Sequence, residues 1–335
     1  MFQLNTGRDI FIAGLCLFFS IILSSCSINK KAQTYSQNPR IYNNFIIVKP
    51  EKNDSLKSIA KKYYNDSSKA WMIAEFNNIE NPTTDKEIVI PLRPFRLGGL
   101  YPMGYQTVPV LAYQRFGVAG NNKSIISQAG FEAQMRFLKE NGYKVITLDQ
   151  LIYFFDFKIQ IPEKSVAITI DEGWSSVIDI AYPILKKYEF PATVFIYTGF
   201  TGGKKALSWE QIRFLEKEGF DIQCQTLTHR NLTKEKKDES FFQYFNALER
   251  ELVDSKKLIK KKLNKECRYI AYPYGKTNHL VVAMLKKHGY RAGFTTNRGE
   301  NPFFVDIYNI NRCVIYGDYD LENFKKNLYI FKKGY

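Results

Sequence analysis

Apolar strand-like runs alternate with amphipathic stretches through residues 108–335 of the chain. Apolar residues repeat at helical spacing near 131–141, 177–188, 209–218, 241–262 and 280–288. The strand-like runs between them lie at 108–112, 144–147, 166–170, 192–197, 220–224, 269–271 and 291–295. This alternation predicts an α/β fold with a parallel sheet, and about seven such repeats suit a (β/α) barrel. In such folds the reactive residues lie where the strands end.

A smaller unit precedes this region at residues 44–92. It begins with a short apolar run at 45–48 and closes with a second one at 88–91. Between them, Asp54 and Ser55 mark a helix start, and a second helical stretch runs from 70 to about 77. The order predicts a small βααβ domain. The polar stretch 26–43 lacks periodicity and is typical of a flexible tether. Residues 93–107 hold two Pro and three Gly and predict a linker.

The residues of the βααβ unit resemble the LysM module. The matching segments read VKPEKNDSLKSIAKKYY, AEFNNIENP and EIVIPL. The resemblance implies binding of an N-acetylglucosamine polymer, such as peptidoglycan or chitin, in a shallow groove. Each matching position also has a core or capping reason to exist, so a unit that only spaces or packs against its neighbour remains an alternative.

The start of the chain predicts export. Residues 10–23 form an apolar run of 14 residues, which is short for a membrane span and typical of a signal-peptide core. The residues Leu23, Ser24, Ser25 and Cys26 follow and resemble a bacterial lipobox, which implies cleavage after residue 25 and lipidation of Cys26. The alternative is an uncleaved anchor helix. Either way the mature chain is expected at the cell envelope, tethered to a membrane that would be the outer one in a Gram-negative cell.

Composition and charge narrow the classes of protein. Of the 335 residues 45% are hydrophobic and 24% charged, which excludes a disordered chain or a low-complexity fibre. The net charge of +15 favours polyanionic surroundings, although scattered lysines can also serve solubility alone. Three of the five cysteines lie beyond the leader, namely Cys224, Cys267 and Cys313, so at most one internal disulfide can form. Without zinc-finger spacing, and given export, nucleic acid is not an expected partner.

Polar residues with catalytic potential follow three of the predicted strands. Asp171 and Glu172 come directly after an apolar strand, where one carboxylate could bind a metal and the other act as a base. The alternative is that the two acidic residues only form a strand-to-helix turn, because Asp and Glu are favoured at the N-terminus of a helix. His229 lies in a Thr-rich loop and suits a metal ligand, an acid–base group or a plain surface residue. Tyr274 lies in a Pro-Tyr-Gly turn, whose backbone N–H groups can bind an oxyanion.

In this order the three segments resemble the polysaccharide deacetylases, the NodB-homology or carbohydrate esterase family 4 group. That family carries Thr-Phe-Asp-Asp-Gly, then Ser-His-Thr-x-x-His-x-x-Leu, then Arg-x-Pro-Tyr-Gly. The segments VPVLAYQRFG and KKHGYRAGFTTNRG match its first and last strands, so the resemblance spans about 105–330. It implies a deacetylase-type barrel in which Asp171 is the general base, Glu172 and His229 hold a divalent, zinc-like metal, and the Tyr274 N–H faces the oxyanion.

The chain departs from the family pattern at several of these positions. Glu172 stands for the second Asp, Gln225 for the first metal-binding His, and Gln114 for a His that often closes the first strand. Ala271 stands where an Arg often steadies the base. Gln225 offers only a neutral amide oxygen, which is a poor zinc ligand. The expected function is metal-dependent N-deacetylation of peptidoglycan or an exopolysaccharide, and the alternative is a deacetylase-fold protein that binds cell-wall glycan without cleaving it.

Overall fold

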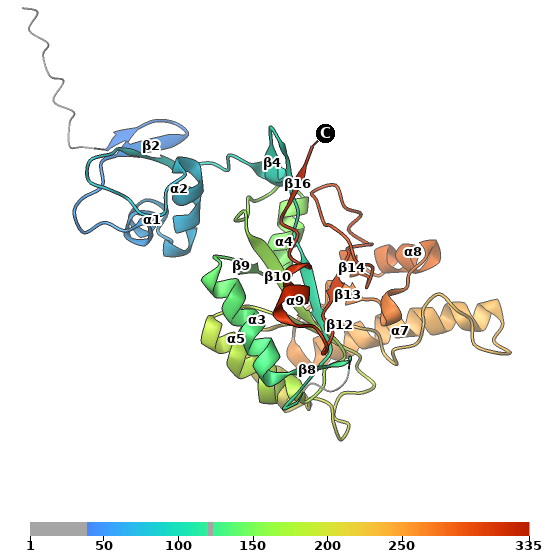
Figure 1. Cartoon of the computed structure of the whole chain (residues 1–335). Coiled ribbons are helices and arrows are strands. Elements are labelled where there is room, and N and C mark those ends of the chain that lie inside the picture. The colour runs from blue at the N-terminus through green and yellow to red at the C-terminus, as the bar shows by residue number, and fades with distance from the viewer. Residues whose placement is uncertain (1–38, 120–122, 335) are drawn as a thin grey trace, which may run out of the picture.

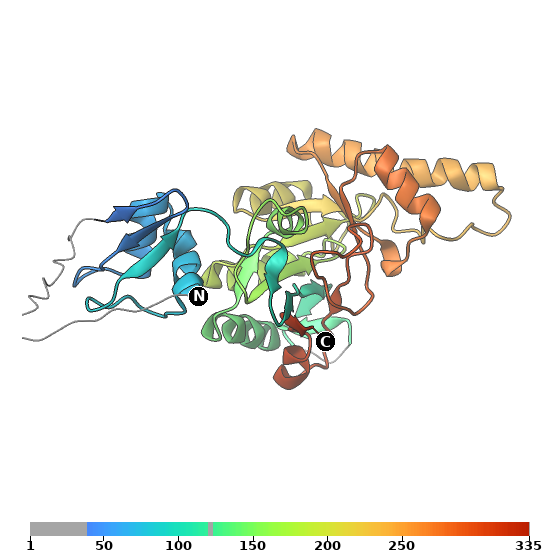
Figure 2. The ribbon, with the colours of Figure 1, turned by 90° about the horizontal axis from the view of Figure 1, so that it is seen from above.

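The computed structural model describes residues 39–119 and 123–334. The predicted signal peptide, the lipidation site Cys26 and most of the predicted tether lie outside the described residues. Within them the chain forms a small N-terminal module and a larger α/β domain, joined by a single segment (Figures 1 and 2). None of the helices in these two ranges is both long and apolar enough to cross a membrane.

The N-terminal module has the predicted order of strand, helix, helix and strand. Its elements are β1 (Arg40–Ile41), β2 (Phe45–Val48), α1 (Leu56–Tyr64), the 3₁₀ turn η1 (Ser67–Lys69), α2 (Ala70–Asn77) and β3 (Ile88–Pro91). Ser55 caps α1 by accepting a hydrogen bond from the Ser58 backbone N–H, as the sequence predicts. Strands β2 and β3 pair antiparallel, and both helices pack on them around Ile59, Ile73 and Ile90.

Residues 93–107 are more ordered than the predicted linker. They contain the turn η2 (Leu97–Gly99) and the strands β4 (Leu100–Tyr101) and β5 (Gly104–Gln106). The C-terminal strand β16 (Phe331–Lys333) pairs antiparallel with β5 and completes a three-stranded sheet. This sheet could not be predicted from the sequence, because its strands are only two or three residues long and are too short to show an alternation of apolar and polar residues.

The large domain is the predicted α/β fold, built on one parallel sheet. The strands follow the order β14-β13-β12-β11-β10-β6-β15, and β9 pairs with the first half of β10. They are β6 (Val110–Tyr113), β9 (Lys144–Ile146), β10 (Ser165–Ile170), β11 (Thr193–Ile196), β12 (Asp221–Cys224), β13 (Tyr269–Ala271), β14 (Ala292–Phe294) and β15 (Cys313–Val314). The seven predicted strands are confirmed, and the sheet curves into a half-barrel. The two-residue strand β15 was not predicted.

Helices cover the outside of this sheet (Figure 1). They are α3 (Gln128–Glu140), α4 (Leu148–Phe155), a π-helical turn η3 (Val177–Ala181) leading into α5 (Tyr182–Tyr188), α6 (Trp209–Lys217), α7 (Phe241–Leu263), α8 (His279–Lys287) and the short α9 (Leu321–Lys325). A small parallel pair, β7 (Arg115–Gly117) and β8 (Ile125–Ser127), lies beyond the end of β6. Helix α4 was not predicted, although the capping box formed by Thr147 and Gln150 at its start is a sequence signature of a helix.

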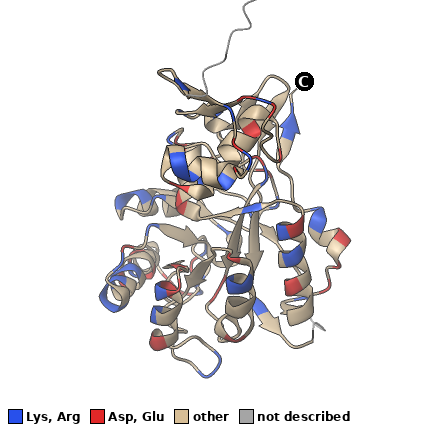
Figure 3. Ribbon diagram, turned by 90° about the vertical axis from the view of Figure 1, so that its left-hand side faces the viewer, with Lys and Arg blue, Asp and Glu red and all other residues tan. Residues whose placement is uncertain are grey.

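The carboxyl edge of the sheet faces away from the N-terminal module. In Figure 1 the chain enters β6 from β5, near β4 at the top, and leaves it toward β8 at the bottom. The module lies beside the upper end, so the strand ends that carry the predicted site lie at the opposite end of the domain. Charged residues of both signs are interspersed on the helices visible in Figure 3, so the positive net charge does not form one basic face in that view.

Candidate active site

Three strand ends bring the predicted site residues to the same edge of the sheet. Asp171 and Glu172 follow β10, the segment from Gln225 to His229 follows β12, and the turn η4 (Pro273–Gly275) follows β13. Strands β10 and β12 flank β11, and β13 pairs with β12. Because the strands are parallel, their carboxyl ends meet at one edge, as the sequence predicts.

Asp171 is buried and held by an arginine that the sequence analysis did not single out. The guanidinium of Arg312 donates two parallel hydrogen bonds to the Asp171 carboxylate, Nη1 to Oδ1 at 2.7 Å and Nη2 to Oδ2 at 2.8 Å. Arg312 is 0% exposed and Asp171 is 4% exposed. The remaining donors of Arg312 bond to the Thr295 carbonyl at 2.8 Å and the Thr169 hydroxyl at 3.2 Å. The geometry fixes the carboxylate and compensates its charge inside the domain.

Arg312 takes over a contact that the motif comparison had placed elsewhere. Ala271 stands at the end of β13, where the family motif has an arginine. Its methyl side chain cannot form a hydrogen bond with Asp171. Arg312 instead reaches the carboxylate from the start of β15, on the opposite side of β10. The base position therefore keeps its cationic partner, although the partner comes from another strand.

Glu172 is oriented by the residues around it. Its carboxylate oxygen Oε2 accepts a hydrogen bond from the indole Nε1 of Trp174 at 2.6 Å. Its backbone N–H donates to the amide oxygen Oε1 of Gln225 at 2.8 Å. The guanidinium carbon of Arg115 lies 3.8 Å from the centre of the Trp174 ring, which places a cation on the indole face. The other carboxylate oxygen of Glu172 accepts no hydrogen bond within the described residues.

A buried glutamate stabilises the loop that carries His229. Glu251, on α7, accepts hydrogen bonds from the backbone N–H groups of Leu227 at 2.9 Å and Thr228 at 2.8 Å. The backbone N–H of His229 donates to the Thr226 hydroxyl at 3.1 Å. The sequence offered no signal for Glu251, because a glutamate inside a long amphipathic helix is ordinary and only its burial sets it apart.

His229 presents a nitrogen with no hydrogen-bond partner. Its ring lies between Tyr197, at 5.1 Å between ring centres, and Tyr274, at 5.0 Å. Its Nε2 is buried and unpaired within the described residues. Burial lowers the pKa of His229 from its ordinary value, although the nearby carboxylates of Glu172, Asp171 and Glu251 act in the opposite direction. The imidazole is therefore neutral at pH 7 and available to a ligand.

Tyr274 projects from the third strand end. It is 61% exposed and has a left-handed backbone with φ of 60°. Gly275 follows with φ of 68°, and a β-carbon there would lie 2.0 Å from the Thr296 hydroxyl oxygen, so only glycine fits. No hydrogen bond of the Tyr274 backbone N–H is present among the described residues, which leaves this donor open for an oxyanion.

Backbone strain gathers at these strand ends. Glu172 and Thr226 have φ of 73°, His229 has 62° and Tyr274 has 60°. Residues other than glycine rarely adopt this left-handed region, least of all a β-branched threonine, and each costs about 1–3 kcal/mol. Such residues cluster at functional sites, where surrounding contacts hold them in place. The strain supports an assignment of this edge as the active site.

The residues do not fit a tightly bound catalytic zinc. Such a site takes three protein ligands. Here the unpaired Nε2 of His229 and one oxygen of Glu172 suit a metal, but the amide oxygen of Gln225 already accepts the Glu172 N–H. Within residues 39–119 and 123–334 there is no group of three His, Cys, Asp or Glu side chains that could hold an ion. The site therefore lacks one of the three ligands that a catalytic zinc needs.

The three cysteines within the described residues take no part in this site. Cys224, Cys267 and Cys313 are buried free thiols. Cys224 immediately precedes Gln225, and its sulfur accepts a hydrogen bond from the Thr226 backbone N–H at 3.2 Å. It thereby supports the start of the His229 loop from within the core.

Comparison with known proteins agrees with the fold. The polysaccharide deacetylase family model matches residues 158–293. The poly-β-1,6-N-acetyl-D-glucosamine N-deacetylase of Staphylococcus aureus is 33% identical over 200 residues, which are 58% of this chain and 68% of that protein.

Solved structures show the same architecture. The Streptococcus pyogenes deacetylase PplD, in complex with acetate, superposes with a TM-score of 0.61 at 26% identity, covering 66% of this chain and 98% of that one. A polysaccharide deacetylase from Bacillus cereus gives a TM-score of 0.56 at 26% identity and covers 72% of both chains. Both likenesses place the half-barrel among deacetylase folds.

Proposed function

This chain belongs to the polysaccharide deacetylase family, whose members are hydrolases that act on carbon–nitrogen bonds, and on that premise we propose that it removes N-acetyl groups from a poly-N-acetylglucosamine polysaccharide. The observation that carries the proposal is the buried Asp171 carboxylate, fixed by Arg312 at the sheet edge beside His229. The similarity to a poly-β-1,6-N-acetyl-D-glucosamine N-deacetylase supports the substrate class.

The reaction adds water to the acetamido carbonyl and breaks its bond to nitrogen. Asp171 takes a proton from the attacking water, and Arg312 keeps the carboxylate in one orientation throughout. The Tyr274 backbone N–H binds the carbonyl oxygen as it gains negative charge. The proton returns to the departing nitrogen, so that acetate and a free amino sugar are the products. The rings of Tyr197 and Tyr274 flank His229 and border the place where the sugar lies.

Deacetylases of this family generally depend on a metal. Because the ligand set in this chain is one short, no step of the reaction above is assigned to an ion. Glu172 and His229 are the two residues that would contact one.

A second candidate function is glycan binding without cleavage. One contact favours it: the Gln225 oxygen is engaged by the Glu172 backbone N–H, where a family member has a metal-binding histidine. In that case the aromatic residues around His229 would bind the sugar, and the buried Asp171–Arg312 pair would serve the fold alone.

Acetate release from poly-N-acetylglucosamine tests the proposal. The wild-type chain should release acetate, and Asp171→Asn should lower the rate by about 10²–10⁴-fold, as removal of a positioned base does. Glycan affinity should stay unchanged in this variant. An absence of acetate from the wild-type chain at any metal concentration, together with retained glycan binding, would favour the second candidate.

We also propose that the chain acts at the cell envelope, anchored by a lipid on Cys26. The apolar run at 10–23 and the residues Leu23, Ser24 and Ser25 before the cysteine support this location. Cys26→Ser should leave the precursor unprocessed or release the protein from the membrane fraction. A variant that still incorporates labelled lipid would contradict the anchor.

The N-terminal module is proposed to hold wall glycan. Its βααβ order and its LysM-like residues support this role. Deletion of residues 44–92 should reduce sedimentation of the protein with insoluble peptidoglycan. Unchanged sedimentation would make the module a spacer.

A further inference from the structure

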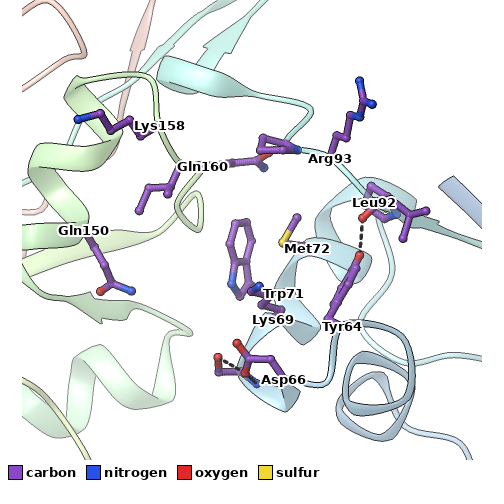
Figure 4. Close-up of a pocket in the computed structure, with 14 residues that line it drawn as sticks. Tyr64, Asp66, Lys69, Trp71, Met72, Leu92, Arg93, Gln150, Lys158 and Gln160 are labelled. Atoms are coloured by element: carbon purple, nitrogen blue, oxygen red, sulfur yellow. Dashed lines mark hydrogen bonds between the residues drawn. The ribbon is translucent and has the colours of Figure 1, made fainter. Parts of the chain in front are cut away.

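A cavity of about 410 Å³ lies between the N-terminal module and the half-barrel (Figure 4). The module contributes residues from the end of α1, from η1 and from the start of α2. The half-barrel contributes Gln150 at the start of α4 and the segment 158–160 that follows this helix. The cavity is separate from the active site, which lies at the opposite end of the large domain.

Hydrogen bonds join the two domains that form the cavity, without any ligand. The carboxylate of Glu75, on α2, accepts a hydrogen bond from the backbone N–H of Glu163 in the half-barrel at 2.9 Å. The side-chain oxygen of Gln160 accepts the backbone N–H groups of Phe95 at 2.9 Å and Arg96 at 3.0 Å. A preformed site loses little freedom when it binds a ligand.

An aromatic platform lines one side of the cavity. Trp71 projects from α2 into the gap between the two domains, with Met72 beside it (Figure 4). The Tyr64 hydroxyl donates a hydrogen bond to the Pro91 carbonyl at 2.8 Å, which fixes that ring in the wall. Trp71 has a large flat apolar face and is only partly buried. Such a face packs well against the C–H side of a sugar ring.

Hydrogen-bonding groups surround this platform. The Asp66 carboxylate lies at the lower end of the cavity in Figure 4 and Gln150 on the opposite wall. The Gln150 oxygen accepts the Thr147 backbone N–H in a helix cap at 2.9 Å, so its amide nitrogen is left to donate outward. An apolar face ringed by separate donors and acceptors matches a ligand that is flat, apolar on its faces and rich in hydroxyl groups at its rim, as a pyranose is.

The charges around the cavity select among sugars. Lys69, Arg93 and Lys158 line it, against the single carboxylate of Asp66. Only Lys158 among the three has a salt bridge in the described structure, to Asp156 at 3.1 Å. This excess of positive charge repels a cationic amino sugar and tolerates a neutral acetylated one.

We propose that this cavity binds an N-acetylated hexosamine unit of a long polysaccharide and rejects the corresponding free amino sugar. The identity of the polymer rests on the proposed function. Because the cavity and the active site lie at opposite ends of the large domain, only a long polymer can occupy both. Occupancy of both sites by one polymer raises the local concentration of acetylated units at the active site. Segments of the polymer that are already deacetylated no longer bind the cavity.

The test measures the affinity of the full chain for soluble β-1,6-linked poly-N-acetylglucosamine by calorimetry. All proteins carry Asp171→Asn, so that the probe is not consumed, and circular dichroism at the temperature of the titration checks that each is folded, because this substitution leaves the buried Arg312 guanidinium without its anion. Trp71→Ala should weaken binding of the polymer at least ten-fold. Phe242→Ala is the matched control, because Phe242 is an aromatic residue, 74% exposed, on α7 of the other domain, and its loss should change nothing.

The chemically deacetylated polymer should bind at least ten-fold more weakly than the acetylated one. The double substitution Arg93→Glu and Lys158→Glu should reduce or reverse that preference, and it carries the test if Trp71→Ala fails to fold. Equal affinity of Trp71→Ala and its parent for the acetylated polymer would overturn the site. Equal affinity for both polymers would overturn its selectivity.

Failure of this proposal is distinguishable from failure of the proposed function. Acetate release from a short oligomer, which cannot reach both ends of the domain, depends on the active site alone. A chain that releases acetate yet binds polymer independently of Trp71 would contradict only the cavity. A chain that binds polymer through Trp71 but releases no acetate would contradict only the proposed deacetylation.

Discussion

The active site has two halves that differ in how completely they are built. On one side, the carboxylate of Asp171 and the guanidinium of Arg312 form a bidentate pair, and Thr295 and Thr169 occupy further donors of the arginine. On the other side, Glu172, Gln225 and His229 lie on strained loop ends, and His229 Nε2 has no partner among the described residues. The base half is a part of the core, whereas the ligand half depends on loops.

Charge and burial decide which residues of this site can be replaced. A buried charge must keep a partner, because an unpaired one costs several kcal/mol. The chain therefore retains an arginine for Asp171 even though it comes from β15 instead of β13. Gln225 is buried as well, but its side chain is neutral and its oxygen accepts the Glu172 backbone N–H, so it can replace a histidine without leaving a buried charge unpaired.

The largest effect is expected from breaking the base half. Arg312→Met leaves the Asp171 carboxylate buried without its cation, which should cost about 3–5 kcal/mol of unfolding free energy. The double variant with Asp171→Asn should recover a large part of this loss, since the uncompensated charge is gone. Urea unfolding of the three proteins measures both effects. A single variant as stable as wild type would show that the pair contributes nothing to the fold.

A smaller effect is expected from loosening the support of the ligand half. Glu251→Gln weakens two hydrogen bonds between a carboxylate and the backbone N–H groups of Leu227 and Thr228. We expect a loss of about 1.5–3 kcal/mol of stability, because bonds to a charged group are worth that much. Glu249→Gln, on the exposed face of the same helix, is the control and should cost far less. Equal losses in the two variants would contradict the supporting role of Glu251.

The smallest effect concerns the protonation of His229. Burial lowers its pKa in the folded protein, so the unfolded chain takes up a proton first as the pH falls. Stability should therefore decrease as the pH falls through the ordinary histidine range near 6.5 and below it. His229→Gln should remove this part of the pH dependence. The difference in unfolding free energy between pH 7.5 and pH 5.5 checks the sign, and an equal difference in both proteins would refute it.

Sequence predicted much of this molecule, and its failures have physical reasons. The long strand β10 was clear as an apolar run and helix α7 from its helical spacing, and the three predicted site segments do follow β10, β12 and β13. Strand β15 was missed because two residues carry no period, and Arg312 was missed with it. Its role depends on burial and on a partner 141 residues away, which no local pattern can reveal.

The site residues themselves were only partly predictable. Adjacent acids after an apolar strand pointed to Asp171 and Glu172 directly. The hydrogen bond between the Gln225 oxygen and the Glu172 N–H depends on the left-handed backbone at Glu172, which a sequence does not show. The cavity at Trp71 forms only where the two domains meet. The sequence of either domain alone therefore shows no pattern that would predict it.

The contrast between the complete base half and the incomplete ligand half is tested most directly by restoring the ligands. Metal content and acetate release are measured for the wild-type chain and for the double variant Gln225→His with Glu172→Asp. The double variant should bind zinc more tightly, because imidazole is a far better zinc donor than an amide oxygen, and its rate of acetate release should exceed that of wild type. A wild-type chain that already equals the double variant in zinc affinity and in rate would show that the ligand half is complete as it stands.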